Sequence, residues 1–220
     1  MKHLIYSSII LLLFSGCSIF DNSDDIQDFG IKTDHILIEG SEQTPLNRNR
    51  NYLNVEFATD LGLDAMNRLL GKYNLSFVNP SINPAEYNYK TIVRVRNKPA
   101  EDFYTNYGSS ISDRFGNDPG IVFALPVYDF EDGSKMFLTN QILVSFDESL
   151  SEERKSQLLD SLKIADHLTH IERQWLGDLY LLQVDKSSPM NSLDLSNHYE
   201  VLDFIRHANP NFGMSIIRHH

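Results

Sequence analysis

The sequence is poor in cysteine, in basic side chains and in glycine-rich phosphate motifs. Cys17 is the only cysteine among 220 residues, which excludes an intrachain disulfide and a metal site built from several thiolates. Acidic side chains outnumber basic ones by 30 to 19, so the formal net charge is -11. This balance argues against nucleic acid as a partner and against simple electrostatic adsorption to anionic lipid. No glycine-rich phosphate loop is present, and we expect no cofactor.

Apolar residues make up 41% of the chain and charged residues 22%, which is typical of a globular protein and not of a disordered one. Eight histidines raise the hypothesis of a metal site. His167 and His170 lie in a predicted strand, where a spacing of three places them on opposite faces. The acidic residues near Glu152 lack the alternating oxygen ligands and the glycine of a calcium loop. We therefore predict no metal site.

The first 16 residues predict an export signal. Met1 to His3 is a short basic start, and Leu4 to Phe14 is an apolar run too short to span a bilayer comfortably. Ser15 and Gly16 then precede Cys17. This pattern resembles the lipobox of bacterial lipoproteins, although Phe14 stands where that family usually has leucine. The alternative is an ordinary signal peptide followed by an incidental cysteine.

The lipobox resemblance implies cleavage before Cys17 and attachment of lipid to that cysteine. Residues 17–30 are short, polar and acidic, and we expect them to tether the folded part to a membrane. The chain would then be a lipid-anchored membrane lipoprotein of the cell envelope, outside the cytoplasm.

The rest of the sequence contains an internal duplication. Leu53 to Leu75 superposes without a gap on Ile142 to Ile164, at the offset of 89 that separates Phe146 from Phe57. In each copy an alternating apolar strand leads into an amphipathic helix. The offset becomes 84 further on, where Ala124 matches Ala208. The repeat predicts two domains, residues 31–130 and 131–220.

Each copy is predicted to fold in the order β-α-β-β-α-β, so the expected fold class is α+β with two tandem ferredoxin-like domains. The strands of the first copy are predicted at Tyr52–Phe57, Leu75–Val78, Thr91–Arg96 and Ile121–Ala124, the last closed by Pro126, and its helices at Leu63–Tyr73 and Ala100–Phe115. The strands of the second are predicted at Gln141–Phe146, His167–Gln174, Leu179–Val184 and Leu202–Ala208, and its helices at Ser151–Leu162 and Met190–Tyr199.

Two connections are predicted as well. Gln43 to Asn51 is polar and basic and is expected to be a loop, whereas Ile36 to Ile38 fits a short edge strand. A hairpin with an Asp-Gly turn is expected to join the two copies tightly. An antiparallel sheet with helices on one face leaves its other face free, and that free face is where we expect a partner.

The second copy resembles the N-terminal propeptide of bacterial subtilisin-like serine proteases, of the fervidolysin type. Three segments carry the resemblance: Gln141–Phe146, Leu179–Val184 and Ala208–Phe212. In that family a strand of this kind precedes the first helix, and a tail of the type Ala-Glu-Pro-Asn-Phe ends the prodomain. The resemblance implies that the open sheet face packs on the protease while the tail lies in the active-site cleft.

Carried onto this sequence, the resemblance implies two contact regions. The docking surface would be formed by the exposed faces of the strands around Val144 and Leu181. The residues of the cleft-binding tail would be Ala208, Asn209, Pro210, Asn211, Phe212, Gly213 and Met214.

The catalytic motifs of those proteases are missing. The sequence stops at His220, where a catalytic domain would begin, and it contains no Gly-Thr-Ser, Asp-Thr-Gly or His-Gly-Thr. We predict that the chain is not an enzyme. The leading hypothesis is a stand-alone propeptide-like lipoprotein that binds a subtilisin-like protease as inhibitor or folding assistant. The alternatives are a non-inhibitory binding or structural lipoprotein that retains the fold, and the truncated N-terminal region of a protease precursor.

Overall fold

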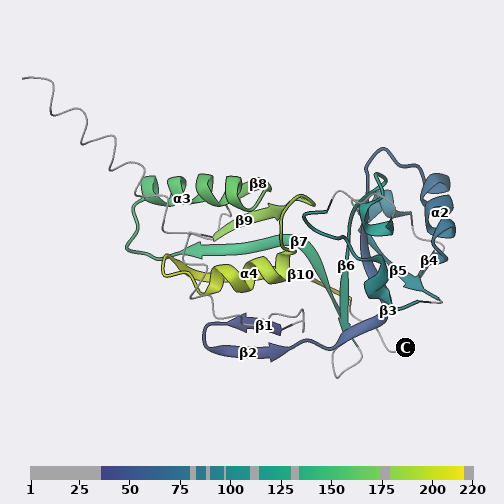
Figure 1. The fold of residues 1–220 in the computed structure, drawn as a ribbon, viewed down its shortest axis with the longest axis horizontal. Coiled ribbons are helices and arrows are strands. Elements are labelled where there is room, and N and C mark those ends of the chain that lie inside the picture. The colour runs from purple at the N-terminus through teal and green to yellow at the C-terminus, as the bar shows by residue number, and fades with distance from the viewer. Residues whose placement is uncertain are drawn as a thin grey trace, which may run out of the picture. The chain divides into compact units, whose positions relative to one another are not determined.

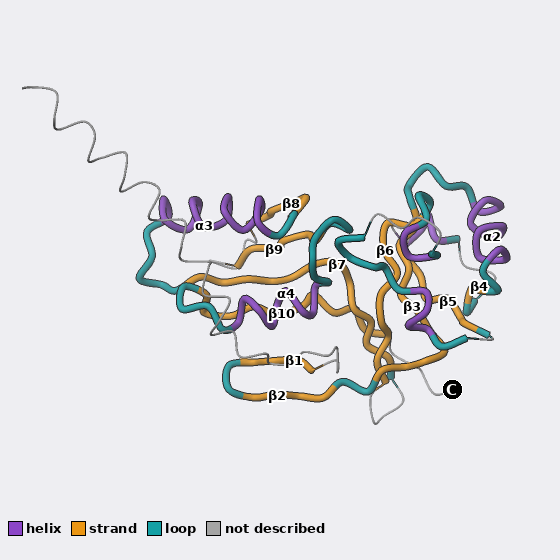
Figure 2. The backbone as a smooth tube through the Cα atoms, in the orientation of Figure 1, coloured by secondary structure: helices purple, strands orange, loops and turns teal. Residues whose placement is uncertain are grey.

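The computed structural model describes residues 36–79, 83–87, 90–96, 98–109, 114–129, 134–173 and 179–215. Residues 35–220 group into one compact unit, distinct from residues 1–34. The described part is a mixed α+β fold with an eight-stranded sheet, a separate two-stranded hairpin and three α-helices (Figures 1 and 2). Every described strand pairing is antiparallel. The predicted export signal and tether lie outside the described residues.

The first half of the sheet has the spatial order β4-β5-β3-β6. Its strands are β3 (Arg48–Phe57), β4 (Leu75–Phe77), β5 (Lys90–Val95) and β6 (Ile121–Asp129). The predicted first helix is confirmed as α2 (Leu63–Lys72), which connects β3 to β4. Met66 and Leu70 recur at helical spacing and are buried in one core with Leu53, Val55 and Phe57 of β3.

The second half has the order β10-β7-β9-β8. Its elements are β7 (Lys135–Phe146), α3 (Glu152–Ala165), β8 (Leu168–Arg173), β9 (Leu179–Val184), α4 (Ser192–Glu200) and β10 (Ile205–Ser215). Helix α3 begins where the sequence predicts, because the Ser151 hydroxyl accepts the backbone N–H of Arg154 at 3.2 Å. Both helices contribute to one core, in which Ile142, Val144 and Phe146 are almost fully buried.

Equivalent elements of the two halves stand at the offsets found in the sequence. Adding 89 to the residue numbers of β5 gives those of β9 at both ends. Adding 84 to Ile121, the first residue of β6, gives Ile205, the first residue of β10. Asn74 and His167 each follow a helix and adopt a left-handed backbone, with φ of 58° and 53°. Asn74 thus separates α2 from β4, and His167 separates α3 from β8 in the same way.

The offset of 89 does not hold between the first helix and the second strand of each half. Helix α3 is four residues longer than α2, about one extra turn. Ile164, predicted to match Leu75, is therefore still helical and is 79% exposed. Leu168 takes the equivalent place at the start of β8, where it is buried like Leu75.

The predicted helix Ala100–Phe115 is wrong. Among the described residues of this stretch, which leave out 110–113, two short 3₁₀ turns form, Ala100–Phe103 and Phe115–Asn117, and residues 104–109 are not helical. Tyr104 packs against the core of the first half, whereas Tyr107 packs against the cores that include α4. The two rings have helical spacing in the sequence but contact different parts of the molecule, so tertiary contacts override the local pattern.

Three further predictions are corrected. Gln43 to Asn51 is not a loop: it contains most of β2 (Glu42–Pro45), which pairs with β1 (Ile36–Glu39), and the start of β3. Strand β6 does not close at Pro126 but runs through it, which is tolerated because the pairing of β6 with β7 begins only at Val127. The last strand extends to Ser215, seven residues beyond Ala208.

Strand β7 joins the two halves. Its first residues pair with β6, its later residues pair with β9, and β10 follows it along its other edge. Figure 1 shows β7 turning away from β6 to run beside β9. A third core lies at this junction and contains Phe123 and Leu125 of β6 with Leu138 of β7 and Leu193 of α4.

Polar contacts reinforce the same junction. The side-chain amide of Asn54 donates to the carbonyl of Leu138 at 2.7 Å. The ammonium of Lys186 donates to the carbonyls of Ile121 and Asp118, and the Lys186 carbonyl accepts the N–H of Gly108 at 2.9 Å. Burial lowers the pKa of Lys186, although nearby carboxylates act in the opposite direction.

We predict that Gly116→Ala strongly destabilises the fold. A Cβ at Gly116 would lie 2.3 Å from the backbone nitrogen of Thr105, so the two backbone segments would have to move apart. We expect a loss of about 3 kcal/mol or more in the free energy of unfolding, measured by urea denaturation. The matched control is Gly71→Ala in α2, where a Cβ meets nothing within 4 Å. It should be neutral or stabilise by up to about 1 kcal/mol, and equal effects of the two substitutions would contradict the close approach.

Buried tyrosines predict alkaline unfolding. Burial raises the pKa of Tyr104, Tyr107, Tyr128 and Tyr199 above the usual value for tyrosine. Above about pH 10 the unfolded chain therefore loses phenol protons that the folded chain retains, and stability falls as the pH rises. Each tyrosine contributes a slope of about 1.4 kcal/mol per pH unit in that range.

Two substitutions check this origin. Tyr107→Phe and Tyr199→Phe should each remove one tyrosine's share of the alkaline slope, measured by urea denaturation at several pH values. They should differ at neutral pH, because the Tyr199 hydroxyl donates to Asp166 at 2.6 Å whereas the Tyr107 hydroxyl has no hydrogen-bond partner among the described residues. At neutral pH, Tyr199→Phe should lower the free energy of unfolding by about 1.5–3 kcal/mol, whereas Tyr107→Phe should leave it almost unchanged. An alkaline slope unchanged by both substitutions would refute the explanation.

Candidate functional site

The sheet face of the second half that lies opposite α3 and α4 is uncharged at its centre. Because side chains alternate along a strand, the residues between Ile142, Val144 and Phe146 lie on this other face. On β7, β9 and β10, the pairing of the strands brings together Gln141 with Gln183, Leu143 with Leu181 and Asn209, and Ser145 with Leu179. We call these seven residues the open face. All seven are partly exposed. At its margins His207 of β10 pairs with Ser145, and Glu172 of β8 pairs with Leu181.

The first half provides an internal comparison for the open face. At the offset of 89, Leu179 corresponds to Lys90, and Gln183 corresponds to Arg94. Ser145 corresponds to Glu56, whose carboxylate pairs with the Lys90 ammonium at 3.3 Å. Burial raises the pKa of Glu56 and outweighs the opposing effect of Lys90. At these three positions the second half therefore has apolar or uncharged side chains where the first half has charged ones.

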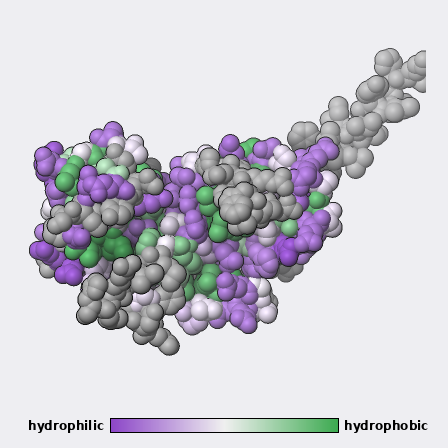
Figure 3. Space-filling view, turned by 180° about the vertical axis from the view of Figure 1, so that it is seen from behind, coloured by the Kyte–Doolittle hydropathy of each residue, from purple (hydrophilic) through white to green (hydrophobic). Residues whose placement is uncertain are grey.

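An uncharged surface with a leucine centre suits a protein interface, since charged residues are depleted at interface cores. Four large apolar side chains of the described residues are exposed: Leu63, Val78, Ile164 and Val201. They belong to different segments and do not form one patch by sequence position. Seen from behind, the described surface is mostly hydrophilic, with hydrophobic residues in small groups (Figure 3). The open face is thus the strongest candidate for a docking surface.

The predicted docking surface is the exposed face of the strands around Val144 and Leu181. Val144 itself is fully buried and packs in the core beneath the helices. Leu143 precedes it and lies on the open face, and Leu181 lies directly opposite Leu143 on β9. Neighbouring residues of a strand face opposite sides of the sheet, so the outward face of β7 is formed by the neighbours of Val144.

The segment predicted to be the cleft-binding tail lies within β10. Ala208, Asn209 and Pro210 pair with β7, and the Ala208 side chain is fully buried. Asn211 lies at a register shift, where its carbonyl accepts the Thr139 hydroxyl at 2.5 Å. The pairs that follow are Phe212 with Leu138, Gly213 with Phe137 and Met214 with Met136. In this structure the segment is a paired strand and not a free tail.

The edge of β10 that faces away from β7 offers no free backbone N–H at Ala208 or at Pro210. The N–H of Ala208 donates to a carboxylate oxygen of Glu200 at 2.5 Å and therefore does not pair with β7. Pro210, two residues further on, faces the same edge and has no N–H. The Glu200 side chain is only 4% exposed, and its other oxygen accepts the N–H of Gly40 at 2.8 Å. Capped or missing donors are a common protection of edge strands against further pairing.

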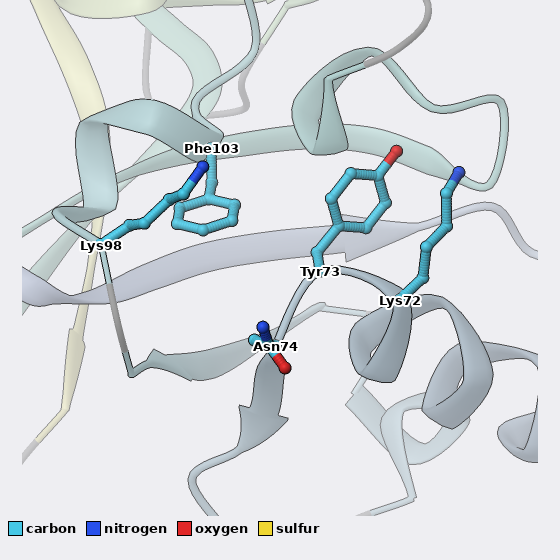
Figure 4. Close-up of a pocket in the computed structure, with 5 residues that line it drawn as sticks. All are labelled: Lys72, Tyr73, Asn74, Lys98 and Phe103. Atoms are coloured by element: carbon cyan, nitrogen blue, oxygen red, sulfur yellow. The ribbon is translucent and has the colours of Figure 1, made fainter.

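A shallow pocket of about 250 Å³ lies in the first half, at the end of α2. Its lining residues are Lys72, Tyr73, Asn74, Lys98 and Phe103. Figure 4 shows Lys98 beside the ring of Phe103, with Tyr73 and Lys72 on the opposite side. The Lys72 ammonium is already paired with Asp118 at 3.4 Å. The pocket offers aromatic contact and positive charge, but its lining contains no carboxylate, histidine or cysteine.

The remaining predicted site residues are placed as follows. The predicted lipidation residue Cys17 lies outside the described residues, as does the side chain of His170. Within the described part, no group of three histidine, cysteine or acidic side chains is arranged to hold a metal ion. No described helix combines the length and apolar character needed to cross a membrane.

Comparisons with protein-family models, with curated proteins and with solved structures find no match to this chain. The candidate site is therefore argued from its geometry. Sequence reasoning missed Glu200, which bridges β10 and the β1–β2 turn. Glu200 and Gly40 are separated by 160 residues, and no local pattern indicates that they meet.

We predict that β10 is protected from hydrogen exchange. The amide of Asn209 should exchange slowly because it pairs with β7, and that of Ala208 should exchange slowly because Glu200 accepts it. Glu200→Ala should accelerate exchange at Ala208 more than at Asn209 and reduce stability by about 1–3 kcal/mol. Glu148→Ala, which removes an exposed carboxylate, is the control and should change neither. Rapid exchange across residues 208–213 of the unaltered chain would show a free tail instead.

Proposed function

We propose that this chain is a propeptide-like binding protein that docks on a subtilisin-like serine protease through its open face. The strand order supports this proposal. In the second half the strands lie in the spatial order β10-β7-β9-β8. Counted along the chain of that half, this is the order fourth, first, third, second, which is the ferredoxin-like order expected of such a propeptide. The first half has the same strand order and replaces the second helix with the segment around Tyr107.

The observation that carries the proposal is the uncharged open face. Leu143, Leu179 and Leu181 are half-buried at its centre, and glutamine, serine and asparagine side chains surround them. Covering what is left of the three leucines would contribute about 2–4 kcal/mol. The surrounding amides and hydroxyl add hydrogen bonds that fix orientation. This combination of an apolar centre and a polar rim is the usual anatomy of a protein interface.

The membrane anchor belongs to the same proposal. Lipid attached to Cys17 would hold the folded unit at the cell envelope, on the extracytoplasmic side of a membrane. The role of the chain would then be to retain, inhibit or assist a protease at that surface. The chain itself would perform no catalysis.

A second candidate is a binding protein that does not inhibit, and the geometry of β10 favours it specifically. A tail bound in a protease cleft pairs its backbone N–H and carbonyl groups with the enzyme. While β10 is folded, the Ala208 N–H is held by Glu200, Pro210 has none, and the other side of the strand is paired with β7. The two candidates share the docking face and differ only in whether the cleft of the bound protease is blocked.

We predict that the double substitution Leu143→Gln with Leu181→Gln weakens binding to a broad-specificity subtilisin at least tenfold, because it removes the apolar centre of the face. The measurement is equilibrium binding of a chain that starts at Ser18, with thermal unfolding to verify the fold. Ile164→Gln is the control, since Ile164 is exposed on α3 and lies outside the face. Equal binding by the double variant and the unaltered chain would contradict the proposed surface.

Hydrolysis of a small chromogenic peptide separates the two candidates. Micromolar binding corresponds to about 8 kcal/mol and allows the protease to be saturated. Loss of hydrolysis in proportion to occupancy identifies an inhibitor. Full hydrolysis at saturation identifies a binder that leaves the cleft open. Absence of binding to subtilisin and to every related protease tested would refute both candidates.

A further inference from the structure

The two halves have the same pair of residues on equivalent sheet faces, but in opposite order. In the first half Asn54 of β3 lies directly opposite Leu125 of β6, on the face that points away from the core around α2. In the second half Leu143 of β7 lies directly opposite Asn209 of β10, on the open face. Residue 143 is residue 54 plus 89, and residue 209 is residue 125 plus 84. Each half therefore places one asparagine beside one leucine on this face.

In the first half this pair is covered by the second half. Asn54 and Leu125 are each only 1% exposed. Leu125 packs in the core that contains Leu138 of β7 and Leu193 of α4. The side-chain amide of Asn54 donates to the Leu138 carbonyl at 2.7 Å, at the bend where β7 leaves β6 and joins β9. The chain thus shows how such a face receives a covering segment: the leucine packs against it, and the asparagine binds one of its backbone carbonyls.

The same pair in the second half remains partly exposed. The side chain of Asn209 forms no hydrogen bond within the described part of the chain, and its Oδ1 atom is shielded from solvent without a donor. A shielded amide oxygen without a donor lowers stability. Folding alone therefore does not explain an asparagine at this position, and local violations of this kind are expected at functional sites.

We propose that Asn209 positions the docked partner by donating its side-chain amide to a backbone carbonyl of the protease. This inference rests on the proposed function, because it takes the open face as the docking surface. The hydrogen bond from Asn54 to Leu138 is the precedent within the chain. The carbonyl would lie in a bend or loop of the partner, since most carbonyls inside helices and sheets already accept backbone N–H groups. The neighbouring Gln141 differs from Asn209, because its Oε1 atom already accepts the amide of Asn211 at 2.9 Å.

One hydrogen bond of this kind gives the open face a direction. Apolar contact with the three leucines is non-directional, so by itself it allows a partner to slide or turn on the face. An amide that requires an acceptor at about 3 Å selects the arrangements that supply one. A partner that covers Asn209 without a carbonyl would bury an unpaired N–H group, and this penalty disfavours the other arrangements.

The first test makes the same substitution at the two asparagines, in a chain that starts at Ser18. Asn209→Leu should raise the midpoint of urea unfolding or leave it unchanged, because it removes an unpaired amide and asparagine is disfavoured in strands. Asn54→Leu should lower the midpoint, because the Leu138 carbonyl then loses its donor inside a closed core. A lower midpoint for Asn209→Leu would show that this amide serves the fold. That result overturns the inference and leaves the docking proposal standing.

The second test measures equilibrium binding to a broad-specificity subtilisin or a related protease. Asn209→Leu and Asn209→Ala should each weaken binding about tenfold, the first even though it adds apolar surface. Asn67→Leu is the matched control, because Asn67 is exposed on α2 in the first half, and it should bind like the unaltered chain. Lost affinity without lost stability distinguishes a contact with the partner from a structural role. Unchanged affinity of both Asn209 variants overturns this inference alone, whereas no binding by the unaltered chain refutes the proposed function and the inference with it.

Discussion

The bend of β7 near Thr139 is the constraint on which the rest of the structure depends. The Asn54 side chain donates a hydrogen bond to the Leu138 carbonyl, and the Ser192 hydroxyl donates one to the Thr139 carbonyl. The Thr139 hydroxyl in turn donates to the carbonyl of Asn211. Three elements from both halves therefore fix the two or three residues at which β7 leaves β6 and joins β9. Because one strand serves both halves, separating them would expose the core around Leu138 and break the pairing of β7 with β6. The two halves therefore belong to one continuous sheet.

The duplication explains how such a chain can have two different surfaces. Both halves keep the same strand order and bury equivalent apolar positions, such as Val55 and Val144. The residues facing away from the cores are under no such constraint, and there the halves differ. Lys90 and Arg94 stand where the second half has Leu179 and Gln183. One scaffold thus presents different side chains on its two halves, and we assign the uncharged open face to a protein partner.

The sequence predicts local features of the fold well and long-range ones poorly. Helix α2, helix α3 and strand β9 are found within a few residues, since their apolar periodicity and the Ser151 cap are encoded locally. The failures arise where contacts between distant residues decide the structure. Tyr107 leaves its expected helix to pack against the other half, and Ala208 is capped by Glu200 instead of ending a free tail. The outward face of β7 follows from the alternation of apolar residues in the sequence, with Val144 buried and Leu143 on the open face.

The central claim is that a protein partner covers the leucines of the open face. Methyl NMR of a chain with labelled leucine and isoleucine tests it most directly, during titration with an inactivated subtilisin. The account predicts that the methyl signals of Leu143, Leu179 and Leu181 shift or broaden together, whereas the signal of Ile164 on α3 stays unchanged. Changes confined to Ile164 or to residues outside the second half, or no change at saturating protease, would contradict the account.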